Sequence, residues 1–144
     1  MTIKSIGIEA NVIPVGVDVG GFLETPKQWN EAGWYKKGSK PSELGNMIIN
    51  AHYDDNYGRP AAFWNLKNIS IGDKVSVLDS YNRVFNYLVT KVYYVGVDDP
   101  NRTDVFEAYE DGKSLLTLIT CGGVWSTQDG TYSKRLVVNA ELIQ

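Results

Sequence analysis

Hydrophobic residues fall in short runs along this chain, and that pattern predicts β-strands. From Ile3 to Pro14 apolar residues alternate loosely with polar ones, which predicts two short strands that turn near Ala10–Asn11. Stronger strand patterns lie further along the chain, over Asn46–His52, Lys74–Asp79, Arg83–Val97 and Tyr132–Leu142. The spacing of these runs indicates a chain made mainly of extended segments.

One further strand, Leu115–Cys121, is a run of Leu, Ile and Thr that ends on a cysteine. A run of this kind is typical of a strand that is covered on both faces. Gly122 and Gly123 follow it, and we expect them to end the strand and to let the backbone turn sharply. The thiol of Cys121 is therefore predicted to lie at the rim of a sheet, within reach of a ligand.

Helical signals are few and short. Pro26 suits the first turn of a helix over Lys27–Glu31, Ala61–Leu66 favours one or two turns, and Thr103–Tyr109 predicts a short helix capped by Thr103. Seven or eight strands with this little helix predict an all-β barrel or sandwich. A length of 144 residues predicts a single domain over 1–144.

Composition narrows the classes of partner. The net charge of −3 and the absence of a basic run argue against binding to nucleic acid. One cysteine cannot form an internal disulfide, and no transmembrane run or signal peptide is present. The acidic pairs Asp54–Asp55 and Asp98–Asp99 could hold a metal ion, but acidic loops are commoner than metal sites, so we expect no metal and no cofactor.

Three residues carry candidate chemistry. Cys121 and His52 are the only cysteine and histidine of the chain, and each ends a predicted strand. Together they form a candidate pair of nucleophile and proton carrier, provided that the fold brings them together. Arg135 lies just inside the last strand, which we expect to flank the cysteine strand and so to return the arginine to the thiol.

Each of the three also has a plainer interpretation: an inert buried cysteine, a surface histidine and a solvated arginine at a strand edge. Their shared position at strand ends favours the functional interpretation. The backbone N–H groups of Gly122 and Gly123 beside the thiol favour it as well, because such donors can hold an oxyanion.

Several segments together resemble the sortase family of cysteine transpeptidases. Thr117–Cys121 matches the TLxTC motif, and Gly45–Asp54 resembles the strand that ends at the sortase histidine, with Ala51 where glycine is usual. Phe63–Leu66 and Ile71–Val75 resemble the segment that follows that histidine, and Gly130–Arg135 places an arginine where sortases carry theirs. The resemblance covers nearly the whole chain and is greatest to class F, whose members often carry the arginine at the position of Ser133.

The resemblance implies a closed eight-stranded barrel with one or two short helices and a groove leading to the cysteine. It implies that Cys121 attacks the threonine carbonyl of an LPxTG-like sorting signal, that His52 carries the proton and that Arg135 holds the substrate or oxyanion. It also implies that the backbone N–H of Gly122 is a second hydrogen-bond donor to the oxyanion. Substrate contacts are expected from residues around the thiol and from the segment before the cysteine strand, namely Thr120, Gly122, Val105, Phe106 and Tyr109.

The implied partners are the sorting peptide of a surface protein and an amine of the cell wall, from lipid II or a stem peptide. The enzyme is then expected on the outer face of a Gram-positive cell membrane, attached through an N-terminal helix that this form of the chain lacks. No lid with an Asp-Pro-Trp-like anchor precedes the barrel, which favours wall anchoring over pilus polymerisation. Two alternatives stay open, a non-catalytic binding module with this fold and a cysteine peptidase or hydrolase.

Overall fold

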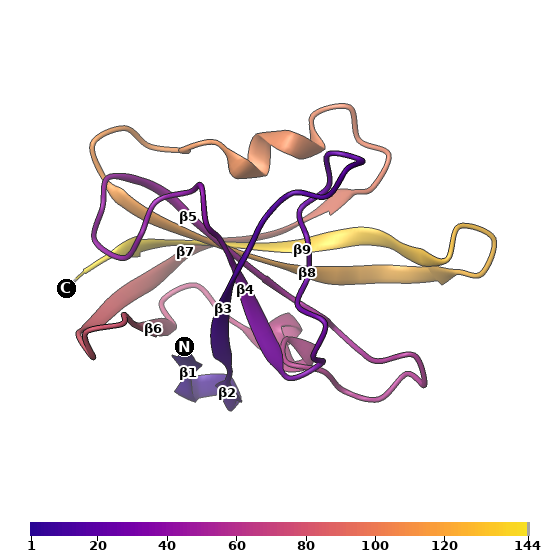
Figure 1. Cartoon of the computed structure of the whole chain (residues 1–144), viewed down its shortest axis with the longest axis horizontal. Coiled ribbons are helices and arrows are strands. Elements are labelled where there is room, and N and C mark those ends of the chain that lie inside the picture. The colour runs from indigo at the N-terminus through magenta and orange to yellow at the C-terminus, as the bar shows by residue number, and fades with distance from the viewer. Residues whose placement is uncertain (144) are drawn as a thin grey trace.

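Short apolar strands, joined by turns rich in glycine, asparagine and proline, wind into one curved sheet (Figure 1). The structure is a computed structural model, and it describes residues 1–143. These residues form nine strands and three short 3-10 helices, in a nearly closed barrel with the strand order β2-β1-β6-β7-β9-β8-β5-β4-β3. The predicted all-β barrel is confirmed, with nine strands in place of eight.

The bounds of β5, β6, β7 and β9 lie within one residue of the predicted strands, whereas β4 was not predicted and β8 extends five residues beyond Cys121. The strands are β1 (Thr2–Ile3), β2 (Ile8–Glu9), β3 (Asn11–Val15), β4 (Glu31–Tyr35), β5 (Gly45–Ala51), β6 (Lys74–Leu78), β7 (Val84–Gly96), β8 (Ser114–Ser126) and β9 (Thr131–Leu142). The 3-10 helices are η1 (Lys4–Ile6), η2 (Trp64–Asn68) and η3 (Arg102–Phe106).

Alternate residues of β5, β8 and β9 fill the barrel interior. Met47, Ile49, Leu116, Leu118 and Val138 belong to this core. The opposite face of β5 and β8 is also largely buried, because the segment between β7 and β8 lies over it. This double cover explains why the cysteine strand is apolar at nearly every position.

Strand register aligns parts of three neighbouring strands, β5, β8 and β9. β5 and β8 pair in parallel, with Asn50 opposite Ile119, and β8 and β9 pair antiparallel, with Cys121 directly opposite Arg135. The expectation that the last strand flanks the cysteine strand is therefore confirmed.

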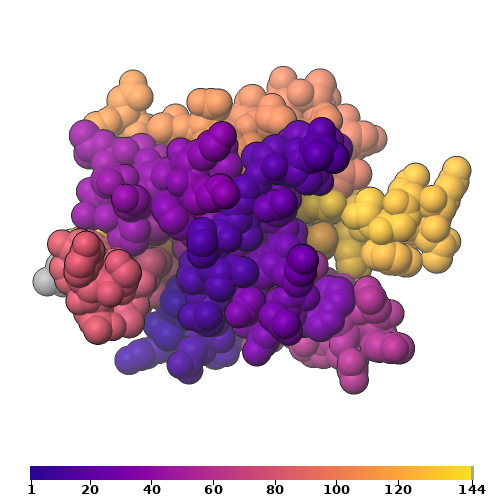
Figure 2. All heavy atoms as spheres, viewed as in Figure 1, coloured from indigo at the N-terminus to yellow at the C-terminus, as the bar shows by residue number. Residues whose placement is uncertain are grey.

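The glycines after Cys121 do not end the strand, so that prediction was wrong. β8 continues to Ser126, and its pairing with β9 shifts between Gly122 and Trp125. Gly123 has a φ of +79°, which a glycine adopts without strain, and the Ser133 hydroxyl accepts a hydrogen bond from the Val124 N–H at 3.0 Å. The hairpin tip beyond this bulge projects from the body of the molecule (Figure 2).

The predicted helix over Lys27–Glu31 is also wrong, since Glu31 already starts β4. The carbonyls of this region are used by other elements: that of Pro26 contacts the His52 ring, and that of Trp29 accepts from the Ala62 N–H. The other two helical segments form short 3-10 turns, η2 and η3, instead of α-helices. Both are shifted by up to three residues from the predicted limits.

Candidate active site

His52, Cys121 and Arg135 are carried by three neighbouring strands. His52 directly follows β5, and continuing the parallel register of β5 and β8 two residues past Asn50 and Ile119 aligns it with Cys121. A hydrogen bond fastens the two strand ends just before these residues, from the Thr120 hydroxyl to the Ala51 carbonyl at 2.8 Å. Arg135 is the cross-strand partner of Cys121. Cross-strand partners share a face of the sheet, so thiol and guanidinium lie on the same side.

The Cys121 thiol is half-buried, and its pKa is raised from the ordinary value. Burial is the main cause, because it penalises the charged thiolate. The positive charge of Arg135 acts in the opposite direction, and the negative charge of Asp54 raises the pKa further. In the free protein the thiol is thus held in its neutral form, and only one of its charged neighbours favours the nucleophilic form.

The Arg135 guanidinium lies along the start of its own strand. Its Nη1 donates to the carbonyls of Tyr132 and Lys134 at 3.1 and 3.0 Å, and its Nη2 donates to the Thr131 hydroxyl at 3.0 Å. These contacts use three of the five N–H donors of an arginine. They hold the charge beside the thiol while leaving donors for a bound anion or carbonyl.

The His52 ring is engaged by the loop between β3 and β4. Its Nε2 lies 2.7 Å from the Pro26 carbonyl oxygen, and its centroid lies 4.4 Å from that of Trp29, with the ring planes 59° apart. Among the hydrogen bonds of residues 1–143, none joins His52 to Cys121. The imidazole is therefore positioned by the loop and not by the thiol.

A cleft of about 410 Å³ opens beside Cys121 and Gly122. Its wall is aromatic: Tyr53 stacks on Trp64 at 4.5 Å and meets Tyr132 edge-on at 5.5 Å. The Lys67 ammonium lies 3.7 Å from the Trp64 ring centroid, a cation–π contact. The abundance of tyrosine and tryptophan in the sequence is typical of a protein with aromatic-lined grooves, but it did not identify the residues of this wall.

Asp54 follows His52 by two residues, in the loop after β5. In the structure its carboxylate accepts a hydrogen bond from the Tyr132 hydroxyl, which crosses from the β5–β6 loop to β9. This bond, followed by burial, raises the pKa of Tyr132 to about 12. Asp54 thus raises the pKa of the nearby thiol, and its hydrogen bond with Tyr132 links the β5–β6 loop to β9.

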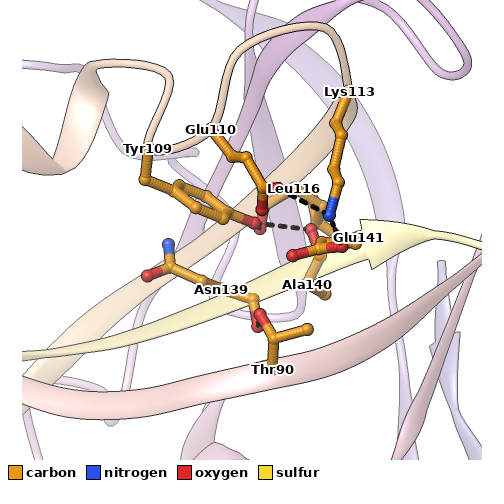
Figure 3. Close-up of polar contacts among 8 residues, drawn as sticks. All are labelled: Thr90, Tyr109, Glu110, Lys113, Leu116, Asn139, Ala140 and Glu141. Carbon is orange, nitrogen blue, oxygen red and sulfur yellow. Dashed lines mark hydrogen bonds and ion pairs between the residues drawn. The ribbon is translucent and has the colours of Figure 1, made fainter.

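The expected substrate contacts differ in their surroundings. Thr120 is buried and its hydroxyl is bound to Ala51, whereas Gly122 borders the cleft. Val105 and Phe106 lie in η3, and the Phe106 side chain is exposed. Tyr109 reaches back over the sheet, where its hydroxyl donates to the Ala140 carbonyl at 2.7 Å (Figure 3). Contact of these residues with a substrate stays a prediction.

In residues 1–143 no group of three or more His, Cys, Asp or Glu side chains is placed to hold a metal ion. Within the same range, no helix has the length and apolar character needed to cross a membrane.

Comparison with protein families gives one match that spans the chain. A model of the sortase domain matches residues 1–143. A search of curated proteins gave no match.

Solved structures of sortases share the fold. The sortase D5 transpeptidase of Clostridium perfringens superposes with a TM-score of 0.70 and 22% identity, over 99% of this chain and 76% of that one. Listeria monocytogenes sortase A gives a TM-score of 0.72 and 18% identity, over 99% and 83% of the two chains. A lid mutant of Corynebacterium diphtheriae sortase A gives 0.74 and 20%, over 99% and 68%.

Proposed function

The chain belongs to the sortase family of cysteine transpeptidases, and from this we propose that it cleaves an LPxTG-like sorting signal after the threonine and transfers the acyl part to a cell-wall amine. Sortases act at the cell surface, on sorting signals and cell-wall amines. The observation that supports the proposal is the register of β5, β8 and β9. It pairs Cys121 with Arg135 and, when continued two residues past Asn50 and Ile119, aligns His52 with Cys121.

In the first half of the reaction, Cys121 attacks the threonine carbonyl as a thiolate. A C–S bond forms, the peptide C–N bond breaks, and the leaving amine takes a proton from His52. Arg135 and the Gly122 N–H stabilise the negative charge on the carbonyl oxygen. Arg135 cannot serve as the base, because a guanidinium stays protonated.

In the second half, the amine of lipid II or of a stem peptide attacks the thioester. His52 accepts the proton from this amine, a new C–N bond forms and the thiolate leaves. The raised pKa of Cys121 supports slow turnover, because only a small fraction of thiols carries the required charge in the free protein.

Specificity for the leucine and proline of the signal is assigned to the segment between β7 and β8. Val105 is partly buried in η3, and the neighbouring Phe106 presents an exposed aromatic ring. The Asn46 side chain fixes this segment over β5 by donating to the carbonyls of Val105 and Glu107 at 3.3 and 2.9 Å. An apolar wall held in one place is what recognition of a short extended peptide needs. We also assign the whole protein to the outer face of the membrane, held by an N-terminal anchor.

The test is mass spectrometry of the protein with an LPxTG-type peptide library and triglycine, in parallel with Cys121→Ala. The proposal predicts a thioacyl adduct and an amine-exchanged product, both absent from the variant. Cleavage without exchange would indicate a peptidase or hydrolase. The absence of any adduct across the library would favour a binding module that retains the fold.

A further inference from the structure

Asn50, in β5, and His52, directly after β5, both contact the loop between β3 and β4 through their side chains. Asn50 donates from Nδ2 to the Glu24 carbonyl at 3.1 Å, and the His52 Nε2 lies 2.7 Å from the Pro26 carbonyl oxygen. Both donors and both acceptors are two residues apart. The loop therefore runs beside the end of β5 as an extended segment whose carbonyls bind side chains instead of backbone N–H groups.

The contact with Pro26 determines which nitrogen of His52 carries the proton. A carbonyl oxygen only accepts, so at 2.7 Å Nε2 must be the donor. In the neutral imidazole the other nitrogen, Nδ1, is then unprotonated, and in the imidazolium both nitrogens carry a proton. Consequently the bond to Pro26 is retained in both charge states, and only Nδ1 gains or loses a proton.

Trp29 confines the ring on another side. Its indole lies 4.4 Å from the imidazole between centroids, and its own carbonyl accepts from the Ala62 N–H at 2.9 Å. The next residue, Phe63, donates its N–H to the His52 carbonyl at 3.0 Å. The β3–β4 loop thus contacts the ring of His52, and the Ala62–Phe63 segment bonds both to this loop and to the backbone of His52.

The Asn50 side chain uses its N–H donor group, and its carbonyl oxygen makes no hydrogen bond among the described residues. Within residues 1–143 its buried Oδ1 has no hydrogen-bond partner and lies against Gly33, where an added Cβ would be only 2.8 Å away. A buried acceptor without a partner costs free energy, so this asparagine is not the choice that stability alone would make. Its contribution is to hold Glu24, and with it the loop that meets His52.

We propose that Asn50 and Trp29 are positioning residues that hold His52 as the Nε2–H tautomer, so that Nδ1 is the atom that exchanges protons in both halves of the reaction. The inference rests on the proposed function. The Cys121 thiol proton passes to Nδ1 as the thiolate forms, and Nδ1 gives it to the leaving amine when the C–N bond breaks. Nδ1 then takes a proton from the incoming amine and returns it to the sulfur as the C–S bond breaks.

The first experiment uses the fact that the chain has a single histidine. In ¹⁵N-labelled protein, long-range ¹H–¹⁵N spectra report the protonation of each ring nitrogen separately. We expect Nε2 to carry the proton of the neutral ring, with its hydrogen slow to exchange with water, and Nδ1 to be the nitrogen without a proton. A neutral form protonated at Nδ1, or an Nε2 hydrogen that exchanges as in a free imidazole, would overturn the proposal.

The variants Trp29→Ala and Asn50→Ala test the positioning. Asn50→Ala removes one hydrogen bond, and Trp29→Ala removes the ring contact with the imidazole. Each change should speed exchange of the Nε2 hydrogen by about five- to tenfold, since the net free energies of the two kinds of contact are similar. Each should also lower kcat by about ten- to a hundred-fold with a smaller change in KM, because a shift of about 1 Å in a reacting group has effects of this size. Trp29→Phe keeps an aromatic ring against the imidazole and should restore much of both properties.

The matched control is Asn86→Ala, because the Asn86 Oδ1 accepts from the Ser76 hydroxyl at 2.7 Å across the β6–β7 pair. It should leave the His52 spectrum unchanged, and an equal effect of both asparagine variants would contradict a specific role for Asn50. The spectra do not depend on turnover, so they separate the two proposals. A protected Nε2–H in a protein without transpeptidation would refute the function and its Nδ1 step while leaving the loop contact intact.

Discussion

At the scale of single residues, two opposite charges act on the pKa of the Cys121 thiol. The arginine across the strand pair favours the thiolate, and the aspartate from the β5–β6 loop opposes it, while burial raises the pKa of Cys121 overall. The nucleophile's charge state is therefore adjustable by changes at Arg135 or Asp54 that do not touch the sulfur.

We predict that Arg135→Gln slows alkylation of Cys121 by iodoacetamide several-fold at neutral pH, and that Asp54→Asn speeds it. The first change removes the charge that lowers the thiol pKa, and the second removes one that raises it. The rate of mass increase measures both, because the chain has one cysteine. Equal rates in the two variants would show that burial alone governs the thiol.

Tyr132 gives a prediction about stability and pH. Its pKa is about 12 in the folded protein, mainly through its bond to Asp54, and about 10 in an unfolded chain. A raised pKa stabilises the folded state fully below about pH 10, and this contribution is lost as pH rises through about 12. Urea unfolding across this range should therefore show a shrinking stability difference between the wild type and Tyr132→Phe. A constant difference would contradict this coupling.

The candidate catalytic residues at the ends of predicted strands were identified from the sequence. The residues that contact and position them were not. His52 and Cys121 are unique in the chain and follow clear strand patterns. Trp29, Asn50 and Tyr132 reach them through loop conformation and strand register, which local spacing does not encode. Their contacts arise only when segments distant in sequence are packed together.

At the scale of elements, the segment between β7 and β8 is fastened to the sheet at two places. The Asn46 side chain holds its middle, and Asn46 itself belongs to a buried chain of hydrogen bonds through Thr117 to Asn139. Near its end the Tyr109 hydroxyl bonds to Ala140, and Lys113 pairs with Glu110 and Glu141 (Figure 3). The proposed specificity wall is thus part of a fixed cover over the sheet.

Tyr109→Phe should lower the free energy of unfolding by about 1 kcal/mol, the usual net value of one hydrogen bond. Chemical denaturation measures this change, and hydrogen exchange of residues 102–109 should rise at the same time. Lys113→Ala serves as the comparison, since its pairs are exposed and such pairs contribute little. A larger loss from Lys113→Ala than from Tyr109→Phe would contradict this account of the segment.

Most long strands were predicted from periodicity, and two of the errors have clear physical causes. Gly122–Gly123 was expected to end a strand, but a bulge absorbs the positive φ of Gly123 and pairing resumes at Trp125. Pro26 was expected to start a helix, but its carbonyl is bound by a histidine ring from another strand. In both cases a tertiary partner outweighs a local preference.

At the scale of the whole molecule, the long strands share one hydrophobic core. Residues from β5, β6, β7, β8 and β9 all contribute to the same core, together with Phe63 and Leu66 from the β5–β6 connection. No long strand of the described chain has a core of its own. Loss of any one of them would therefore expose the interior of the others.

We predict a single cooperative unfolding transition in urea. Circular dichroism reports the sheet, and fluorescence reports the four tryptophans, which lie in different parts of the barrel. The two signals should give the same midpoint, as expected for a domain with one core. Separate midpoints would show that part of the barrel unfolds on its own.

The parallel pairing of β5 with β8 also has a consequence for how the protein reaches its native state. The cysteine and arginine strands form one hairpin, a contact that closes quickly, whereas the bond from Thr120 to Ala51 joins residues 69 positions apart. We expect the thiol to gain its neighbouring cation early and its histidine late. Reactivity toward peptides then begins only once this long-range contact has formed, so an incompletely folded chain is unreactive.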